Sequence, residues 1–86
     1  MQQMNKDLTS ILNTPIVKRS VNIAGHATSV SIEKPFWDAF KNLAKTQSKS
    51  INQLITEIDD ARLQEKSINL SSAIRLYVLE NLKTNL

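Results

Sequence analysis

The chain has 86 residues, of which 41% are hydrophobic and 22% charged, a composition typical of one small globular domain rather than a linker or a disordered tail. Cysteine is absent and histidine occurs once, which excludes disulfides, thiolate chemistry and an ordinary Cys/His zinc site. The net charge of +3 is too small to indicate a partner by itself. A core of this size is marginal, so we expect a second subunit to supply further stability.

The chain contains no apolar run long enough to cross a membrane, and its polar first 15 residues do not fit a secretory signal. We therefore expect a cytoplasmic protein that has no membrane partner.

The positive charge is concentrated in one segment. Residues 17–50 carry a net +4, whereas residues 1–16 are neutral and residues 51–86 carry −1. A basic segment in an otherwise near-neutral chain is the electrostatic footprint of a polyanion binder, and a solvated lysine face is the alternative interpretation.

Residues 1–16 are predicted to form an N-terminal arm with one short helix. Its apolar residues share one helical face: Leu8, Ile11 and Leu12. Asn5 or Asp7 is suited to cap this helix, and Pro15 ends it because the residue before a proline is disfavoured in the helical conformation. So short a helix is weak alone and needs a surface to pack on.

From residue 17 the apolar period changes to two, which predicts β-structure. Val21 and Ile23 alternate with polar residues, and so do Val30 and Ile32. The phase of the alternation shifts across residues 24–27, where the only glycine of the chain lies. Two short strands joined by a turn, or one strand broken by a bulge, both satisfy this pattern.

Three helices are predicted after the strands. The first begins at Pro35 and ends near Gln47, and its apolar stripe is Phe36, Trp37, Phe40, Leu43 and Ala44. Ser50 and Gln53 fit a capping box for the second helix, whose apolar face is Ile51, Leu54, Ile55, Ile58 and Ala61. Residues 64–69 are predicted to be a loop. The third helix is capped by Asn69 or Ser71 and extends through Lys83. Because it is apolar over much of its circumference, we expect it to pack against a second chain.

A strand over residues 28–32 cannot persist alone, because it leaves a row of unpaired backbone groups. A hairpin within the chain gives a two-stranded sheet, which is also marginal. The simplest remedy is the same strand from a second copy, paired antiparallel about a two-fold axis. In that arrangement Val30 and Ile32 face the helices, and Ala27, Ser29 and Ser31 lie on the outer face.

The segment from Thr28 to Glu33 (TSVSIE), the helix from Pro35, the turn SKS at 48–50 and the helix from Ile51 resemble the ribbon-helix-helix DNA-binding proteins. These are small bacterial homodimers, mostly transcriptional repressors or antitoxins. The wider motifs KRSV at 18–21, GH at 25–26, FWDA at 36–39 and LSSA at 70–73 are similar to a variant group of small bacterial ribbon-helix-helix proteins. The resemblance covers about residues 18–82.

The resemblance implies a mainly α-helical homodimer with a short intermolecular antiparallel β-ribbon and an additional C-terminal helix. The ribbon would lie in the major groove of double-stranded DNA, where outward side chains read base edges. The DNA-binding residues it implies are Lys18, Arg19, His26, Ala27, Ser29, Ser31, Ser48, Lys49 and Ser50. Of these, Ser48, Lys49 and Ser50 would lie at a phosphate bound by the start of a helix. Small ribbon residues predict modest base discrimination.

The residues expected in the core or the dimer interface are Val30, Ile32, Phe36, Trp37, Phe40, Leu54, Ile55, Ile58 and Tyr77. For Trp37 we favour core or dimer packing over base stacking, and for Tyr77 a buried or interfacial ring whose hydroxyl reaches a polar partner. A lone histidine, His26, is better explained as structural or solvated than as a ligand. The acidic residues at 57, 59 and 60 lack the ligand count of a calcium loop, which favours a solvated helix end.

The sequence contains no recognisable acid, base, nucleophile or metal constellation, so we expect a protein that is not an enzyme and has no cofactor. The favoured interpretation is a dimeric, repressor-like transcriptional regulator that assembles with itself as a homodimer or in a higher-order assembly. The alternative is a protein-interaction module, such as an antitoxin-like toxin binder, with weak or no DNA binding. We expect an arm at residues 1–16, a ribbon-helix-helix core at 17–65 and a supporting C-terminal helix at 66–86.

Overall fold

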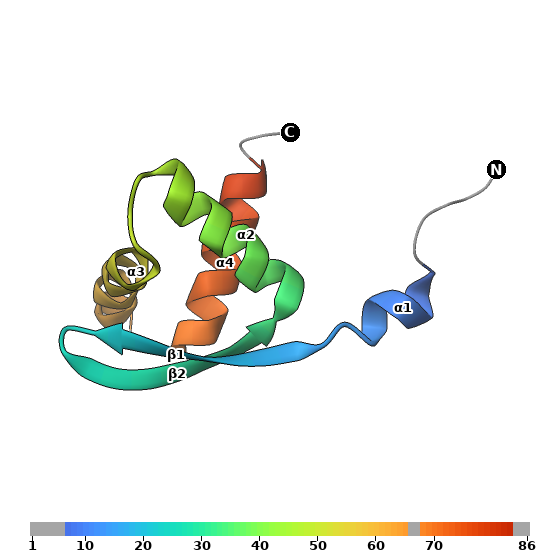
Figure 1. Cartoon of the computed structure of the whole chain (residues 1–86), viewed down its shortest axis with the longest axis horizontal. Coiled ribbons are helices and arrows are strands. Elements are labelled where there is room, and N and C mark those ends of the chain that lie inside the picture. Colours follow the sequence, from blue (N-terminus) through green and yellow to red (C-terminus); the bar gives the residue numbers. More distant parts are fainter. Residues whose placement is uncertain (1–6, 66–67, 84–86) are drawn as a thin grey trace.

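The computed structural model describes residues 7–65 and 68–83. Its elements follow in the order α1 (Leu8–Leu12), β1 (Ile16–Ile23), β2 (His26–Glu33), α2 (Lys34–Thr46), α3 (Ile51–Glu65) and α4 (Leu70–Lys83). Helices α2, α3 and α4 lie together on one face of a β-hairpin, and α1 stands apart at the opposite end of the long axis from α3 (Figure 1). The molecule measures 50 × 25 × 23 Å.

The two strands form one antiparallel hairpin, paired from Ile23 with His26 to Ile16 with Glu33. The two connecting residues, Ala24 and Gly25, both have left-handed backbone angles, with φ of +51° and +84°. Two such residues define the type I′ turn, whose twist matches that of the strands. The sequence left a turn and a bulge open, and the structure shows the turn.

The register puts the odd residues of β1 and the even residues of β2 on the face toward the helices. Val21, Val30 and Ile32 are buried there, as the alternation predicted. The strand that pairs with β2 belongs to the same chain, so the sheet of one chain is a two-stranded hairpin and not a lone strand. A second copy can pair with β2 only along the edge that β1 leaves free.

Local side-chain caps define the helix starts. Asp7 accepts a hydrogen bond from the Ser10 N–H at 2.9 Å, and Asn69 accepts one from the Ser72 N–H at 2.8 Å. The predicted capping box is confirmed, with the Ser50 N–H donating to Gln53 Oε1 at 2.7 Å and the Gln53 N–H to Ser50 Oγ at 3.0 Å. Helix α3 continues to Glu65, so the first two residues of the predicted loop at 64–69 are helical instead.

The core lies between the hairpin and the three helices. Its fully buried side chains include Ile32, Phe40, Leu54, Ile55 and Ile74. The other hydrophobic residues with less than a tenth of their surface exposed are Val21, Val30, Trp37, Ala44, Ile58 and Val78. Of the nine residues predicted for the core or interface, seven are buried, and Phe36 and Tyr77 pack half-buried against them.

Aromatic rings fill the centre of this core. The ring of Phe40 lies 5.9 Å from that of Trp37 and meets Tyr77 edge-on at 6.3 Å. Gln47 donates its side-chain amide to the Tyr77 hydroxyl at 2.6 Å. The predictions of a core position for Trp37 and of a polar partner for the Tyr77 hydroxyl are confirmed.

Helix α4 packs on the core through Ile74 and Val78 and exposes Leu76, Leu79 and Leu82 on its other sides. Arg75 fixes it to the end of β2, because its guanidinium donates to both carboxylate oxygens of Glu33 at 2.7 and 3.4 Å. That hydrogen bonding lowers the pKa of the Glu33 carboxyl. No helix among the described residues is long and apolar enough to span a membrane.

Candidate nucleic-acid interface

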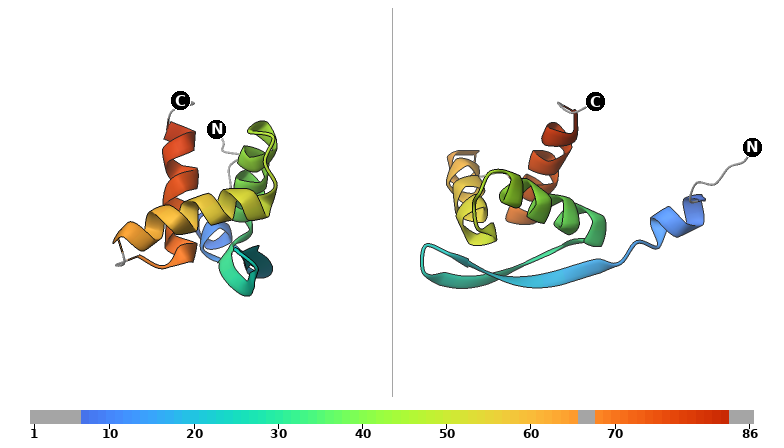
Figure 2. Two further views of the ribbon diagram at one scale, coloured as in Figure 1. Left: turned by 90° about the vertical axis from the view of Figure 1, so that its left-hand side faces the viewer. Right: turned by 45° about the horizontal axis from the view of Figure 1, so that its top comes forward.

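The face of the hairpin that points away from the helices is uncovered. Figure 2 shows from two further sides that α2, α3 and α4 lie over the opposite face. Three cross-strand pairs occupy the uncovered face: Lys18 with Ser31, Ser20 with Ser29, and Asn22 with Ala27. All six residues are exposed. We call this set the outer face.

The outer face contains four of the predicted DNA-binding residues, Lys18, Ala27, Ser29 and Ser31. It also contains two polar residues that the sequence did not nominate, Ser20 and Asn22. The alternation on β1 was visible in the sequence, but only the register with β2 shows that Ser20 and Asn22 share a face with Ser29 and Ser31.

The hydrogen-bonding direction of the hairpin leaves one edge of β2 available. The Asn22 N–H donates to Asn52 Oδ1 on α3 at 3.1 Å and therefore points away from β2. Paired residues in an antiparallel ladder alternate between hydrogen-bonded and non-hydrogen-bonded pairs. Because Asn22 and Ala27 form a pair of the second kind, so do Ser20 with Ser29 and Lys18 with Ser31. The N–H and C=O groups of Ser29 and Ser31 thus point out from the far edge of β2.

Arg19 has the opposite facing. The register pairs it with Val30 on the helix-facing side, and its exposed side chain acts electrostatically on Asp38 of α2. The Lys34 ammonium donates to Asp38 at 2.8 Å, and the Lys41 ammonium lies 3.9 Å from the same carboxylate. The hydrogen bond from Lys34, then the charges of the surrounding cations, lower the pKa of Asp38. Three basic side chains therefore gather around one acid beside the hairpin.

His26 also belongs to the helix-facing side, paired with Ile23. It lines a depression of about 440 Å³ together with Asp59 and Asp60 of α3. Arg19 and His26 therefore lie on the opposite side of the hairpin from the outer face, although they were predicted to bind DNA together with residues of that face.

The turn before α3 uses most of its own N–H groups. Ser48, with a φ of +57°, donates its N–H to Lys45 O at 3.0 Å, and the Lys49 N–H donates to Ala44 O at 2.9 Å. The capping box occupies the N–H groups of Ser50 and Gln53. The capping box does not use the N–H groups of residues 51 and 52 in the first turn of α3. These two groups lie one and two residues beyond Ser50, where the predicted phosphate site ends.

The ammonium of Lys49 is engaged as well. It lies 2.7 Å from Glu57 Oε1 in the second turn of α3, and both side chains are partly exposed. Pairs of this kind are weak, so an anion can compete for the lysine. Glu57 therefore partly neutralises the positive charge of Lys49.

The hairpin turn and the start of α3 lie side by side. Asn22 and Asn52 join them directly, and a polar depression of about 460 Å³ opens between the Ala24–Gly25 turn and Ser50. The outer face and the predicted phosphate site are therefore adjacent.

The acidic residues of α3 do not converge on a cation site. Asp59 is held by the guanidinium of Arg62 at 2.6 Å. Within residues 7–65 and 68–83 no group of three or more His, Asp or Glu side chains is placed to hold a metal ion.

Comparison with known proteins adds one match. A model of the ribbon-helix-helix domain family matches residues 16–82, from the first residue of β1 to the penultimate residue of α4. No curated protein and no solved structure matches the chain. Ribbon-helix-helix domains are in general regulators that dimerise and bind DNA. The match spans most of the sequence, and the chain belongs to the ribbon-helix-helix domain family.

Proposed function

We propose that this protein is a dimeric, repressor-like regulator that places the outer face of its β-ribbon in the major groove of double-stranded DNA. The observation that carries the proposal is a polar sheet face with no helix over it, bordered by a strand edge whose backbone groups point outward. We assign the arm to residues 1–16, the DNA-binding core to 17–65 and a supporting helix to 66–86, and we assign the protein no catalytic role.

Pairing of the free β2 edge with that of a second copy completes the ribbon. An antiparallel two-fold arrangement satisfies the outward N–H and C=O groups of Ser29 and Ser31 in both chains. The result is a sheet in the order β1-β2-β2-β1, with the two β2 strands at its centre.

The width of this sheet gives the β1 and β2 residues of the outer face different positions on the DNA. Four strands span about 14 Å between the outermost pair, whereas the major groove is about 12 Å wide. The two central β2 strands fit the groove, and the flanking β1 strands lie toward its phosphate walls. Ser29 and Ser31 then face base edges, and Lys18, which neighbours Ser31 across the hairpin, faces phosphate.

The side chains set the expected specificity. Serine hydroxyls both donate and accept, and alanine contributes only a methyl group, so the β2 residues favour close approach over strong discrimination. Asn22, at the turn end of β1, lies toward the phosphate walls like Lys18, and its carboxamide can donate to a phosphate oxygen. Lys49 and the free first-turn N–H groups of α3 provide a phosphate contact beside it.

The proposal is tested by selection from a random DNA duplex library with the purified protein at low salt, followed by sequencing. An enriched inverted repeat supports it and gives the half-site spacing. Specific binding should weaken about 1,000-fold or more between 50 and 200 mM salt if about six phosphates are contacted. Retention of no DNA by a folded protein would refute it.

A second function is favoured by a different observation. Leu63, Leu76, Leu79 and Leu82 are each at least half exposed on α3 and α4, away from the outer face. A module that binds a protein partner through these leucines, as an antitoxin binds a toxin, would depend little on salt, because apolar burial is not screened.

A further inference from the structure

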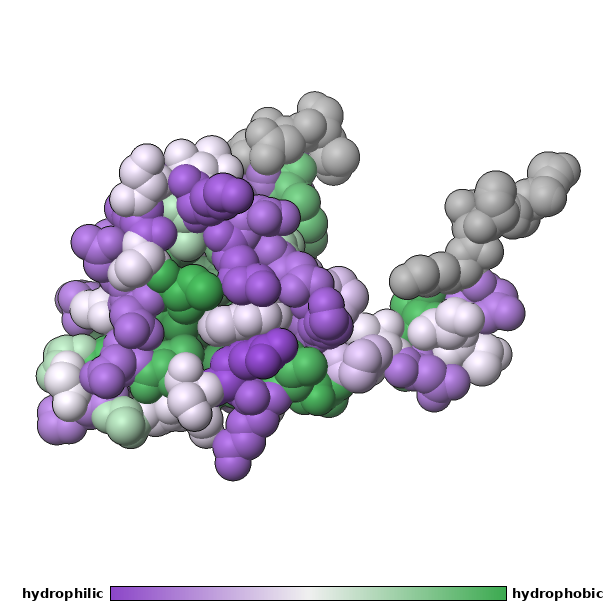
Figure 3. Space-filling model, in the orientation of Figure 1, coloured by the Kyte–Doolittle hydropathy of each residue, from purple (hydrophilic) through white to green (hydrophobic). Residues whose placement is uncertain are grey.

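The exposed large hydrophobic residues of the described chain fall into two separate groups. Four lie on the N-terminal arm: Leu8, Ile11, Leu12 and Ile16. The other four lie on α3 and α4: Leu63, Leu76, Leu79 and Leu82. Figure 3 shows the arm standing away from the body with hydrophobic surface exposed on it.

Three residues of the first group, Leu8, Ile11 and Leu12, form an exposed face of helix α1. Leu8 and Leu12 are 75% and 81% exposed, and no residue of α1 is buried. Five helical residues do not hold their conformation in water without tertiary packing. Helix α1 therefore needs an apolar surface outside the arm on which to pack.

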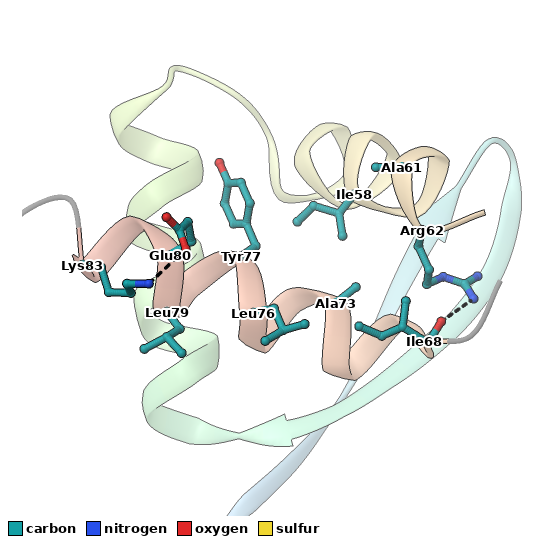
Figure 4. A pocket seen from close by; sticks show the side chains of 10 residues that line it. All are labelled: Ile58, Ala61, Arg62, Ile68, Ala73, Leu76, Tyr77, Leu79, Glu80 and Lys83. Carbon is teal, nitrogen blue, oxygen red and sulfur yellow. Dashed lines mark hydrogen bonds and ion pairs between the residues drawn. The ribbon is translucent and has the colours of Figure 1, made fainter. Parts of the chain in front are cut away.

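Two residues of the second group, Leu76 and Leu79, line a groove between α3 and α4 of about 620 Å³. Ile58 and Ala61 of α3 and Leu76 and Leu79 of α4 line it, with the ring of Tyr77 between them (Figure 4). The charged residues of its lining are Arg62, Glu80 and Lys83, of which Lys83 pairs with Glu80 and Arg62 with Asp59. The groove is thus largely apolar, like the exposed face of α1 that Leu8, Ile11 and Leu12 form.

The arm cannot enter the groove of its own chain. Its base is tied to α2, because the Lys34 N–H donates to the Pro15 carbonyl at 2.9 Å. The three residues between α1 and β1 span about 10 Å at most. Helices α1 and α3 lie at opposite ends of a molecule 50 Å long (Figure 1).

A second copy removes this obstacle. In the antiparallel ribbon of the proposed function, on which this step rests, the partner runs in the opposite direction. Its hairpin turn and its α3 then lie at the end where the first arm emerges. Edge pairing alone buries little side-chain surface, since each sheet already has its own helices on the inner face, whereas stable dimers bury about 800 Å² per partner. The arm and groove supply the missing area.

We propose that the α1 arm of each chain packs into the α3–α4 groove of a second copy. Leu8, Ile11 and Leu12 contact Leu76 and Leu79 of the partner copy, and the exchange is reciprocal about the two-fold axis. The arm acts as a clasp that locks the dimer.

The absence of cysteine makes a direct test possible. Variants L12C and L79C are mixed and mildly oxidised, and their covalent heterodimer is the expected main product. K45C, an exposed position in the last turn of α2, replaces L79C as the control and should give background only. An internal disulfide in the monomeric double variant L12C/L79C, or no product above the control, would overturn the exchange.

A second measurement covers variants that do not cross-link. Leu12→Gln and Leu79→Gln should each raise the dimer Kd by about 100-fold or more, because each dimer loses two buried leucines. The double variant should be little worse than either single one, since both remove the same contact. Ser10→Gln, on the opposite side of α1, is the matched control and should change little. Full additivity or an unchanged Kd would overturn the proposal.

The two experiments distinguish the arm–groove contact (the clasp) from the β2–β2 pairing (the ribbon). If Ser29→Pro dissociates the dimer while no L12C–L79C product forms, the clasp is wrong and the ribbon stands. If the product forms although Ser29→Pro has no effect, the clasp stands and the ribbon is wrong.

Discussion

The free edge of β2 can be blocked without touching the hairpin itself. Val30 is an unsuitable target, because it is only 2% exposed in the chain's own core and a charge there would unfold the protein whether or not it dimerises. Ser29 is different. Its N–H points away from β1, so a proline at this position removes no hydrogen bond within the hairpin but removes one to a partner strand.

The magnitude follows from symmetry. Ser29→Pro removes one backbone hydrogen bond from each chain, or two from each dimer. At a net contribution of about 0.5–1.5 kcal/mol for each bond, the dimer loses about 1–3 kcal/mol. The Kd should rise by about 5- to 150-fold, and steric conflict between the proline ring and the partner strand adds to this.

The matched control is Ser20→Pro. Ser20 is the cross-strand neighbour of Ser29, and its N–H points out from the other edge, so this variant carries the same backbone restriction without facing the partner β2. Sedimentation equilibrium gives the Kd, and far-ultraviolet circular dichroism checks the fold. An equal change in both variants, with the fold retained, would show that the ribbon is not the dimer contact.

Four further predictions use the same chain. Lys18→Ala should reduce the slope of log affinity for DNA against log salt by about 1.8, since two copies each lose one phosphate contact of about 0.9, and an unchanged slope places Lys18 off the DNA. Lys49→Gln should lower the affinity for all DNA duplexes about equally, whereas Glu57→Gln, which frees Lys49, should raise it. Fluorescence anisotropy measures both affinities. A change of the same sign in both variants excludes a phosphate contact at Lys49. Phe40→Ala should destabilise the chain by about 3–5 kcal/mol in urea unfolding, because the ring is fully buried, and a loss below 1 kcal/mol contradicts its central position. Glu33→Gln should lower the free energy of unfolding by about 0.5–1 kcal/mol. Because folding lowers the pKa of Glu33, this difference from wild type is complete above pH 4.5 and disappears as the pH falls through the folded pKa. A difference that persists in acid contradicts the Arg75 pair as its cause.

Local patterns in the sequence were enough to predict most of the elements. The odd and even alternation around the single glycine, the capping box of Ser50 with Gln53, and the stripe through Trp37 and Phe40 each involve residues close in the chain. Such patterns depend on backbone geometry and nearby hydrogen bonds, and the structure confirms them. The end of α3 was missed because polar residues at a helix end do not distinguish a last exposed turn from a loop.

The candidate site depended on contacts that the sequence does not encode locally. Only the register of β1 against β2 shows that Asn22 shares a face with Ser29 and that Arg19 does not. Likewise, the ion pair of Lys49 with Glu57 forms across the turn before α3.

The sequence by itself determined the helices, the β-structure on either side of Gly25 and the ribbon-helix-helix character, because periodicity and capping act within a few residues. Tertiary structure alone decided which polar residues gather on one face and which strand edge stays open. It also decided which apolar residues are left outside the core. These depend on the packing of segments distant in sequence, where a shift of one residue in register reverses every side chain.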